Sequence, residues 1–307
     1  MSKTGGGVGG PLHDPIPIGE IAAPPFVSLP DPLTLFSRRA ERFVALAAGH
    51  ELGPYLRVLA DVSACQHRIQ DDLPEPDLPV GDARARQHGM PAIDRSHFTA
   101  DAALDATLDR LFAAAAGIDM PATARAALTS ASRADAATRY AMVHSVLADS
   151  IPVQALADHV FVAAALQVHF ARLAARLDPE ALAPVDDGAC PACGGAPVAS
   201  SVVGWKGAHG ARFCACSLCA TQWHVVRIKC VLCGSTEGIG YQELDGGAGA
   251  VKAETCEECR GYVKILHQHT DPALDPVADD VASLGLDLLL REKGYRRGAV
   301  NPFLLGY

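Results

Sequence analysis

Eight of the ten cysteines in this chain form four Cys-x-x-Cys pairs. The pairs are, in order, Cys190 with Cys193, Cys216 with Cys219, Cys230 with Cys233, and Cys256 with Cys259. One such turn presents two sulfur atoms to a single ion, and two turns complete the tetrahedron of thiolates that suits Zn²⁺ or iron. Adding 40 to the numbers of the first four cysteines gives the second four, which indicates an internal duplication. The sequence therefore predicts two metal ions in two four-cysteine sites.

Each repeat could supply its own site, or pairs from different repeats could share one. Local pairing is favoured because it closes shorter loops and explains why the unit recurs as a block, with 22 residues between the pairs in both copies. Four thiolates leave no open position for water or substrate, which argues against hydrolysis by the metal. The sequence contains no glycine-rich phosphate loop, His-Glu-x-x-His motif or nucleophile elbow. We therefore expect no enzyme activity, no catalytic residues and no cofactor-binding residues besides the metal ligands.

Two cysteines remain outside the pairs. Cys214 has no counterpart in the second repeat, because the position 40 residues later is Glu254. It is either a buried or half-exposed thiol beside the first site, or a spare ligand or redox thiol. Cys65 lies on the apolar stripe of a predicted helix and is interpreted as a small core residue.

Four histidines near the cysteine pairs are possible ligands by residue type. They are His209, His224, His267 and His269. Because four thiolates already complete each tetrahedron, these histidines are interpreted as structural or surface residues.

The composition describes a globular and acidic protein. The 307 residues are 49% hydrophobic and 20% charged, with a net charge of -9, which disfavours a phosphate-binding surface and therefore nucleic acid as a partner. No run of about 18 apolar residues and no signal-peptide pattern is found, so we expect a cytoplasmic protein without membrane insertion. Ser37-Arg38-Arg39 resembles a twin-arginine export signal, but the apolar stretch at 44–48 is too short. These arginines are interpreted as the solvated face of a helix.

The region before the paired cysteines has helical patterning. Residues 1–30 are rich in Pro and Gly and are expected to form an irregular leader. Asp31-Pro32 then provides an N-cap and a first-turn proline. Helices are predicted over 31–49 and 54–70, around 104–112 and 121–130, and over 140–147 and 156–177, with a long loop at 71–91 and a linker at 178–188.

The cysteine region and the C-terminus complete an α+β fold class. Strands are predicted at 198–205, 221–228, 239–244 and 261–266, forming hairpins of zinc-ribbon or rubredoxin type. One amphipathic helix is predicted over 275–294, and the apolar tail at 301–307 is expected to dock on the protein's own core. The expected segments are a leader (1–30), an all-α helical domain (31–183), two tandem four-cysteine ribbons (184–228 and 229–270), and a C-terminal helix with its tail (271–307).

With these motifs in place, the chain resembles the FdhE family of formate dehydrogenase accessory (formation) proteins. The resemblance covers about residues 30 to 307 and rests on specific stretches of sequence. They are Arg39-Ala40, Pro54-Tyr55-Leu56, Gln66, Cys190-Pro191-Ala192-Cys193-Gly194-Gly195, Cys230-Val231-Leu232-Cys233-Gly234, residues 256–262, residues 279–287, residues 294–297, and Asn301-Pro302.

The resemblance implies a cytoplasmic helper that binds the catalytic subunit of a respiratory, molybdenum-dependent formate dehydrogenase and is needed for its activity. It also implies rubredoxin-like iron, whereas a set of four cysteines by itself suits zinc equally well. An electron carrier whose thiolate-bound iron sites cycle between redox states is the alternative function, and a zinc-ribbon nucleic-acid binder is a third. The oligomeric state stays open.

Overall fold

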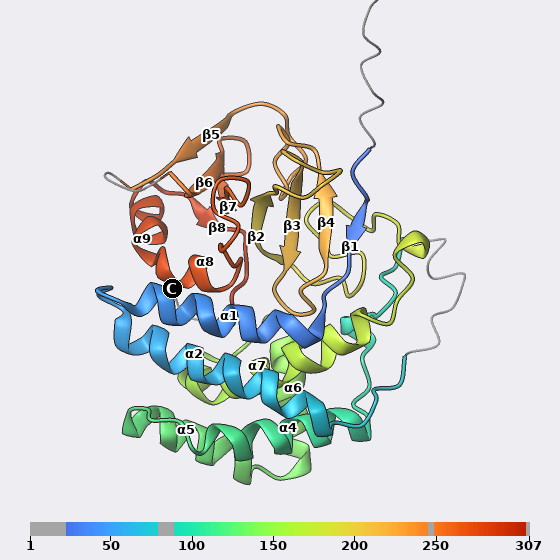
Figure 1. The fold of residues 1–307 in the computed structure, drawn as a ribbon, viewed down its shortest axis with the longest axis vertical. Coiled ribbons are helices and arrows are strands. Elements are labelled where there is room, and N and C mark those ends of the chain that lie inside the picture. The colour runs from blue at the N-terminus through green and yellow to red at the C-terminus, as the bar shows by residue number, and fades with distance from the viewer. Residues whose placement is uncertain (1–22, 79–88, 245–248, 305–307) are drawn as a thin grey trace, which may run out of the picture.

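The computed structural model describes residues 23–78, 89–244 and 249–304. A layer of helices forms the lower half of the molecule in Figure 1, and a single sheet stands above it. The long helices are α1 (Pro32–Ala47), α2 (Gly53–Arg68), α4 (Ala102–Ala115), α5 (Ala122–Arg133), α6 (Ala136–Leu147) and α7 (Leu156–Ala174). The helices predicted before the cysteine region are therefore present, and one continuous hydrophobic core joins them to the sheet.

Helix α7 is the central helix of this layer. Most of its residues are buried, and it packs against α4, α5 and α6. The stretch Val153–Ala174 is long and apolar enough to cross a membrane by composition, but 61% of its apolar 18-residue window is buried within the protein. This burial is typical of the core helix of a folded domain.

The strands form one sheet. They are β1 (Val27–Ser28), β2 (Pro197–Val202), β3 (Arg212–Cys216), β4 (Gln222–Val225), β5 (Ile239–Gln242), β6 (Val251–Cys256), β7 (Gly261–Leu266) and β8 (Arg296–Arg297). Their order is β1-β4-β3-β2-β7-β6-β5, with β8 also on β7. The sequence pattern does not predict β3 and β6, because each ends at a ligand cysteine and carries little apolar alternation.

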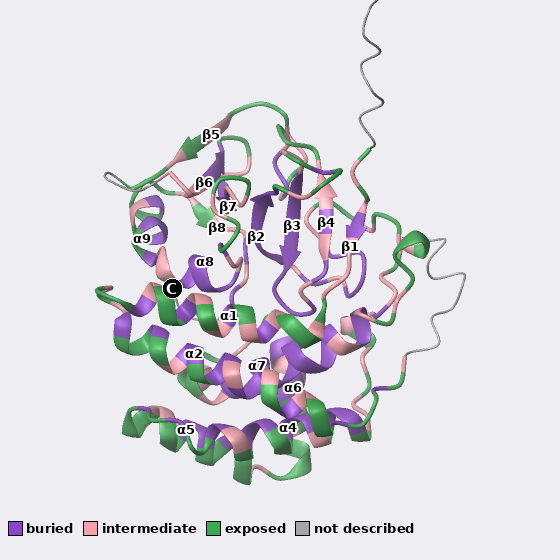
Figure 2. Ribbon diagram, viewed as in Figure 1, coloured by how far each residue is buried: buried purple, intermediate pink, exposed green. Residues whose placement is uncertain are grey.

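The two repeats are joined edge to edge in this sheet. Strands β2, β3 and β4 belong to the first repeat, and β5, β6 and β7 occupy the corresponding places in the second. The repeats meet where β2 pairs with β7 in parallel, with Ser200 opposite Ile265. Joining the repeats in this way buries β2, β3 and β7 completely, whereas β5 at the outer edge stays largely accessible (Figure 2).

The expected leader contains a structured part. Val27 pairs with Trp223, so β1 covers the edge of β4 that would otherwise be open. In the second repeat the corresponding edge, on β7, is covered by β2 and β8. The rest of the leader, residues 1–22, lies outside the described residues.

The C-terminal helix is interrupted. The predicted single helix is divided at Ser283 into α8 (Ala278–Ala282) and α9 (Leu284–Glu292), and Asp275 Oδ1 accepts from the N–H of Ala278 at the start of the first. Both lie beside the second repeat (Figure 1). The division allows Asp280 and Asp287 to turn toward one ammonium group, that of Lys264 on β7, at 3.2 and 2.5 Å.

The tail and the arginine pair of α1 complete the core. Phe303 and Leu304 are buried, as predicted for a docked tail, and residues 305–307 lie outside the described residues. Arg38 is exposed, but the prediction of a solvated position is wrong for Arg39, which is only 3% exposed and binds Asp275. That ion pair fixes α1 to the start of α8. The helical region, the two four-cysteine clusters and the sheet together confirm the α+β fold class.

Candidate metal centres

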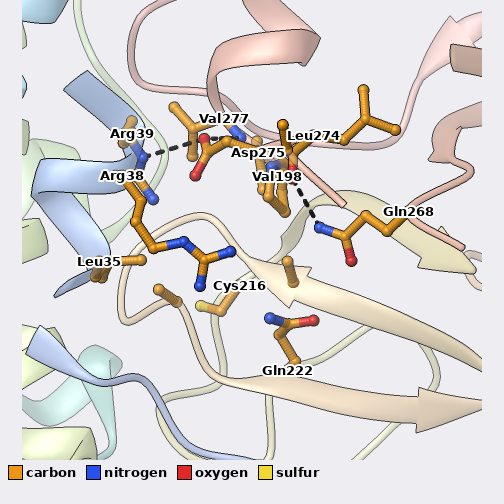
Figure 3. A pocket seen from close by; sticks show the side chains of 14 residues that line it. Leu35, Arg38, Arg39, Val198, Cys216, Gln222, Gln268, Leu274, Asp275 and Val277 are labelled. Atoms are coloured by element: carbon orange, nitrogen blue, oxygen red, sulfur yellow. Dashed lines mark hydrogen bonds and ion pairs between the residues drawn. The ribbon is translucent and has the colours of Figure 1, made fainter. Parts of the chain in front are cut away.

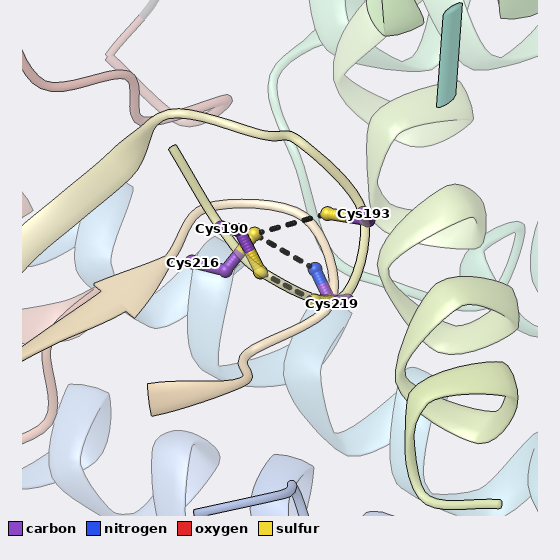
Figure 4. A group of neighbouring side chains, drawn as sticks. All are labelled: Cys190, Cys193, Cys216 and Cys219. Carbon is purple, nitrogen blue, oxygen red and sulfur yellow. Dashed lines mark hydrogen bonds between the residues drawn. The ribbon is translucent and has the colours of Figure 1, made fainter. Parts of the chain in front are cut away.

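The first site is built from two loops that face each other (Figure 4). One loop precedes β2 and carries Cys190 and Cys193; the other begins at Cys216, the last residue of β3, and carries Cys219. Cys190 Sγ lies 3.6 Å from Cys219 Sγ, and Cys193 Sγ lies 3.4 Å from Cys216 Sγ. All four sulfur atoms lie within 4.8 Å of one another, and all four residues are buried.

The second site repeats this arrangement. Cys230 Sγ lies 3.8 Å from Cys259 Sγ, and the same distance separates Cys233 Sγ from Cys256 Sγ. The four sulfur atoms again lie within 4.8 Å of one another. Each repeat thus assembles its own cluster, which is the local pairing rather than the arrangement that shares cysteine pairs between repeats.

The backbone turns also repeat with the 40-residue offset. The N–H of Gly194 donates to Cys190 O at 2.8 Å, and that of Gly234 donates to Cys230 O at 2.9 Å. Both glycines have a φ of 74°, a conformation that favours glycine because it has no Cβ. The residue that follows the second cysteine pair of each repeat, Ala220 or Arg260, also has a positive φ in the left-handed region. The same local geometry therefore forms twice.

Both clusters fit a tetrahedral metal ion. Metal–sulfur bonds of about 2.3 Å in a regular tetrahedron place neighbouring sulfur atoms about 3.8 Å apart. The measured separations of 3.4 to 3.8 Å match this spacing. Backbone N–H groups of Leu218 and Cys219 point at Cys216 Sγ, as expected around a thiolate ligand. The two groups could hold two metal ions.

The electrostatics of the first cluster favour mixed protonation in the metal-free state. Burial raises the pKa of Cys190 well above its ordinary value. Burial acts in the same direction on Cys216, but hydrogen bonds from the three neighbouring thiols outweigh it and hold its pKa well below the ordinary value. A dicationic metal would supply the positive charge needed to ionise the remaining thiols.

A cation from the helical region lies beside the first site. A Cβ built on Gly195 would lie 3.1 Å from Cys216 Sγ, 3.2 Å from Cys193 Sγ and 3.9 Å from Nη1 of Arg95. Arg95 is held there by its ion pair with Asp149 at 2.5 Å. Its position could not be predicted from the sequence, because it lies in the chain almost 100 residues before the cysteines and carries no spacing signal.

A small cavity reaches the first site from another side. It has a volume of about 110 Å³ and lies between α1, the β2–β4 strands and the start of α8. Figure 3 shows the side chain of Arg38 extending into it toward Cys216 and Gln222. The Oε1 atom of Gln222 is buried and has no hydrogen-bond partner among the described residues.

The other candidate residues lie outside both clusters. Cys214 is fully buried, and burial raises its pKa to about 12, so its thiol stays neutral at ordinary pH. Cys65 is fully buried on α2. No histidine joins a group of possible metal ligands within the described residues. Of the four histidines near the cysteine pairs, His209 and His269 are exposed, and His224 and His267 are half-buried.

Comparison with known proteins covers nearly the whole chain. Three family models match: FdhE, N-terminal, over residues 24–187; FdhE, central domain, over residues 189–227; and FdhE, C-terminal domain, over residues 228–304. The boundaries between the matches fall at the start of the first repeat and between the repeats.

Similar proteins and a solved structure agree with these matches. The Protein FdhE homolog of Rhizobium meliloti (strain 1021) is 47% identical over 298 residues, covering 96% of this chain and 97% of that protein. Protein FdhE of Escherichia coli O9:H4 (strain HS) is 36% identical over 273 residues, covering 88% of each chain. The crystal structure of the FdhE protein from Pseudomonas aeruginosa superposes with a TM-score of 0.81 at 35% identity, covering 92% of this chain and 99% of that one. The resemblance seen in the sequence is therefore confirmed, and the chain belongs to the FdhE family.

Proposed function

We propose that this protein is an accessory protein of formate dehydrogenase. It binds the catalytic subunit of that enzyme in the cytoplasm and is required for the enzyme to become active. The observation that carries the proposal is membership of the FdhE family over nearly the full chain, together with two complete four-cysteine clusters. The protein itself is not the enzyme in this proposal, because each metal would be fully coordinated by thiolates and would have no place for a substrate.

The proposed metal ligands are the eight paired cysteines. They are Cys190, Cys193, Cys216 and Cys219 in the first site, and Cys230, Cys233, Cys256 and Cys259 in the second. Iron in rubredoxin-like coordination is the metal that the family resemblance favours, and zinc fits the same ligands. Either ion would stabilise the loops that carry the cysteines, since binding energy at such a site is largely folding energy. The shape of the partner-binding surface would then depend on the metals.

Deletion and complementation in the source organism test the function. Removing the gene should abolish formate dehydrogenase activity, and a tagged copy should restore activity and recover the catalytic subunit from the cytoplasmic fraction. A Cys190→Ser copy should restore little activity, and Cys65→Ala, a change at a buried cysteine far from both clusters in sequence, provides the matched control. Full formate dehydrogenase activity in the deletion strain, with no complex recovered, would refute the proposal.

An electron carrier is the second candidate function. It is favoured by the exposure of Cys233, because electron transfer needs one edge of a centre to come close to its partner. Metal analysis and an absorption spectrum of anaerobically purified protein separate the two ideas. Protein that contains zinc alone would eliminate the carrier and leave the accessory function standing.

A further inference from the structure

We propose that the two sites have different roles: the second is an exchangeable metal site that opens at Cys233, whereas the first releases its ion much more slowly. This inference rests on the metal binding proposed above. It goes beyond that proposal because the two sites have the same ligands and nearly the same sulfur geometry, and differ only in what surrounds them.

The two sites differ in the access that solvent has to their sulfur-bearing residues. At the first site, Cys190, Cys193 and Cys219 are 0% exposed and Cys216 is 2% exposed. At the second, Cys230 and Cys256 are buried, but Cys259 is half-buried and Cys233 is exposed. Positions 193 and 233 are equivalent in the repeat, so the difference does not arise from the local turn.

The first site is covered by parts of the helical region. Backbone N–H groups of Ala92 and Ile93 donate to Pro191 O and Ala192 O, at 3.4 and 2.6 Å, and so lay the loop before Arg95 over the first cysteine pair. On the other side, Gln167 of α7 donates to the carbonyl of Ser217 at 2.9 Å, which fixes the second pair. Both cysteine pairs of this site are therefore held by the helical layer.

The cavity beside Cys216 does not make the first site equivalent to the second. The cavity is small, with a volume of about 110 Å³, and Cys216 itself is only 2% exposed. Arg38 also extends into that space in front of Cys216 (Figure 3). An incoming chelator would have to displace the Arg38 side chain to reach Cys216 from this side.

The second site is supported mainly from the side of Cys230 and Cys259. Leu232 packs against Gly261 and Gly298, where an added Cβ would lie only 2.6 and 2.2 Å from its side chain. The backbone N–H of Arg296 on β8 donates to Arg260 O at 2.7 Å. On the side of Cys233, Asp187 approaches the following Gly234, but the residue Cys233 itself remains exposed.

Exposure of one thiolate provides a route for ligand exchange. A donor atom of an incoming chelator binds the ion as the bond to Cys233 Sγ breaks, and the released thiolate takes up a proton from water. The oxidation state of the metal does not change. Release of the other three thiolates follows in the same way, while the first site would first have to separate from the helical layer.

Metal release from the intact wild-type protein tests the inference. Zn²⁺-loaded protein is mixed with excess 4-(2-pyridylazo)resorcinol, and iodoacetamide is added at intervals so that alkylated cysteines can be mapped by mass spectrometry. We expect two phases of one ion each, with rates at least tenfold apart. Cys233 and the other cysteines of the second site should be alkylated in the fast phase, and those of the first site in the slow phase.

Matched substitutions at equivalent positions identify the phases independently. Cys233→Ser should remove the fast phase and keep the slow one, and Cys193→Ser should do the reverse. A single rate for both ions, or alkylation of Cys193 as fast as Cys233, would overturn the inference even if two ions bind. Protein unable to bind added Zn²⁺ would instead refute the metal binding itself, and the inference with it.

Discussion

Arg212 of β3 donates a hydrogen bond at 2.8 Å to Glu254 of β6, across the line where the two repeats meet. Arg212 is 0% exposed and Glu254 is 4% exposed, and Arg212 also donates to Ser200 Oγ on β2 at 3.1 Å. Glu254 occupies the position in the second repeat that corresponds to Cys214 in the first. Cys214 and Glu254 thus occupy the same position in the two repeats. Of the two, Glu254 joins the repeats through its ion pair with Arg212.

Breaking this ion pair should strongly destabilise the protein. Glu254→Leu leaves the Arg212 guanidinium buried without its counter-charge, and we expect a loss of about 3 to 5 kcal/mol in the free energy of unfolding. Chemical denaturation followed by circular dichroism measures the change. The double variant Arg212→Met/Glu254→Leu should recover most of the loss, because no buried charge remains. Equal losses in the single and double variants would contradict the pairing.

A buried histidine in α7 predicts a loss of stability in acid. Burial lowers the pKa of His169 from 6.5 to about 4, and neither of its ring nitrogens has a hydrogen-bond partner among the described residues. Between these pH values the unfolded chain takes up a proton that the folded protein does not. The contribution of His169 is therefore present above pH 6.5 and is lost as the pH falls toward 4, by at most about 3 kcal/mol.

The variant His169→Phe isolates this contribution. Phenylalanine suits the site because Phe98 and Phe170 already surround the imidazole. Protonation of the cysteine ligands in acid affects both proteins, so the comparison is the difference in unfolding free energy between variant and wild type at each pH. That difference should grow in favour of the variant from pH 6.5 to about 4; parallel curves would show that His169 does not titrate on unfolding.

Gly195→Ala should weaken the first site. The added methyl carbon would lie 3.1 and 3.2 Å from the sulfur atoms of Cys216 and Cys193, closer than ordinary packing allows. We expect a loss of about 1 to 3 kcal/mol and reduced retention of one metal ion, measured by thermal unfolding and metal analysis. The equivalent residue, Ser235, already carries a Cβ, so Ser235→Ala is the control and should retain both ions.

Cysteines of different roles should respond differently to substitution. Cys190→Ser should release the first metal and unfold the loops around it, because the binding energy of a structural metal is largely folding energy. Cys65→Ala should keep both metals and cost only about 1 to 2 kcal/mol through a small cavity in the helical core. Metal content and melting temperature of the two variants provide the measurement. An equal effect on metal content would contradict the core role of Cys65.

Local patterns in the sequence are sufficient for the ligand sets and for most elements. The spacing of the cysteines is a property of short turns, so the 40-residue offset alone separates Cys216 from Cys214. Capping and periodicity likewise predict α1, where Asp31 accepts from Leu33 N. The strands that end at ligand cysteines, β3 and β6, escape prediction because their residues are chosen by metal coordination and by the buried ion pair, and not by apolar alternation.

The sequence by itself determined the helical region, the two sets of four cysteines and the family, because each depends on residues close together in the chain or on directly matched motifs. The tertiary structure decided which neighbours each site receives. Two turns with the same covalent spacing become a buried site beneath Arg95 and α7, and a site with Cys233 open to solvent. Those neighbours lie in distant parts of the chain, and only the packing of the helical layer over the cysteine loops of the first repeat brings them into contact.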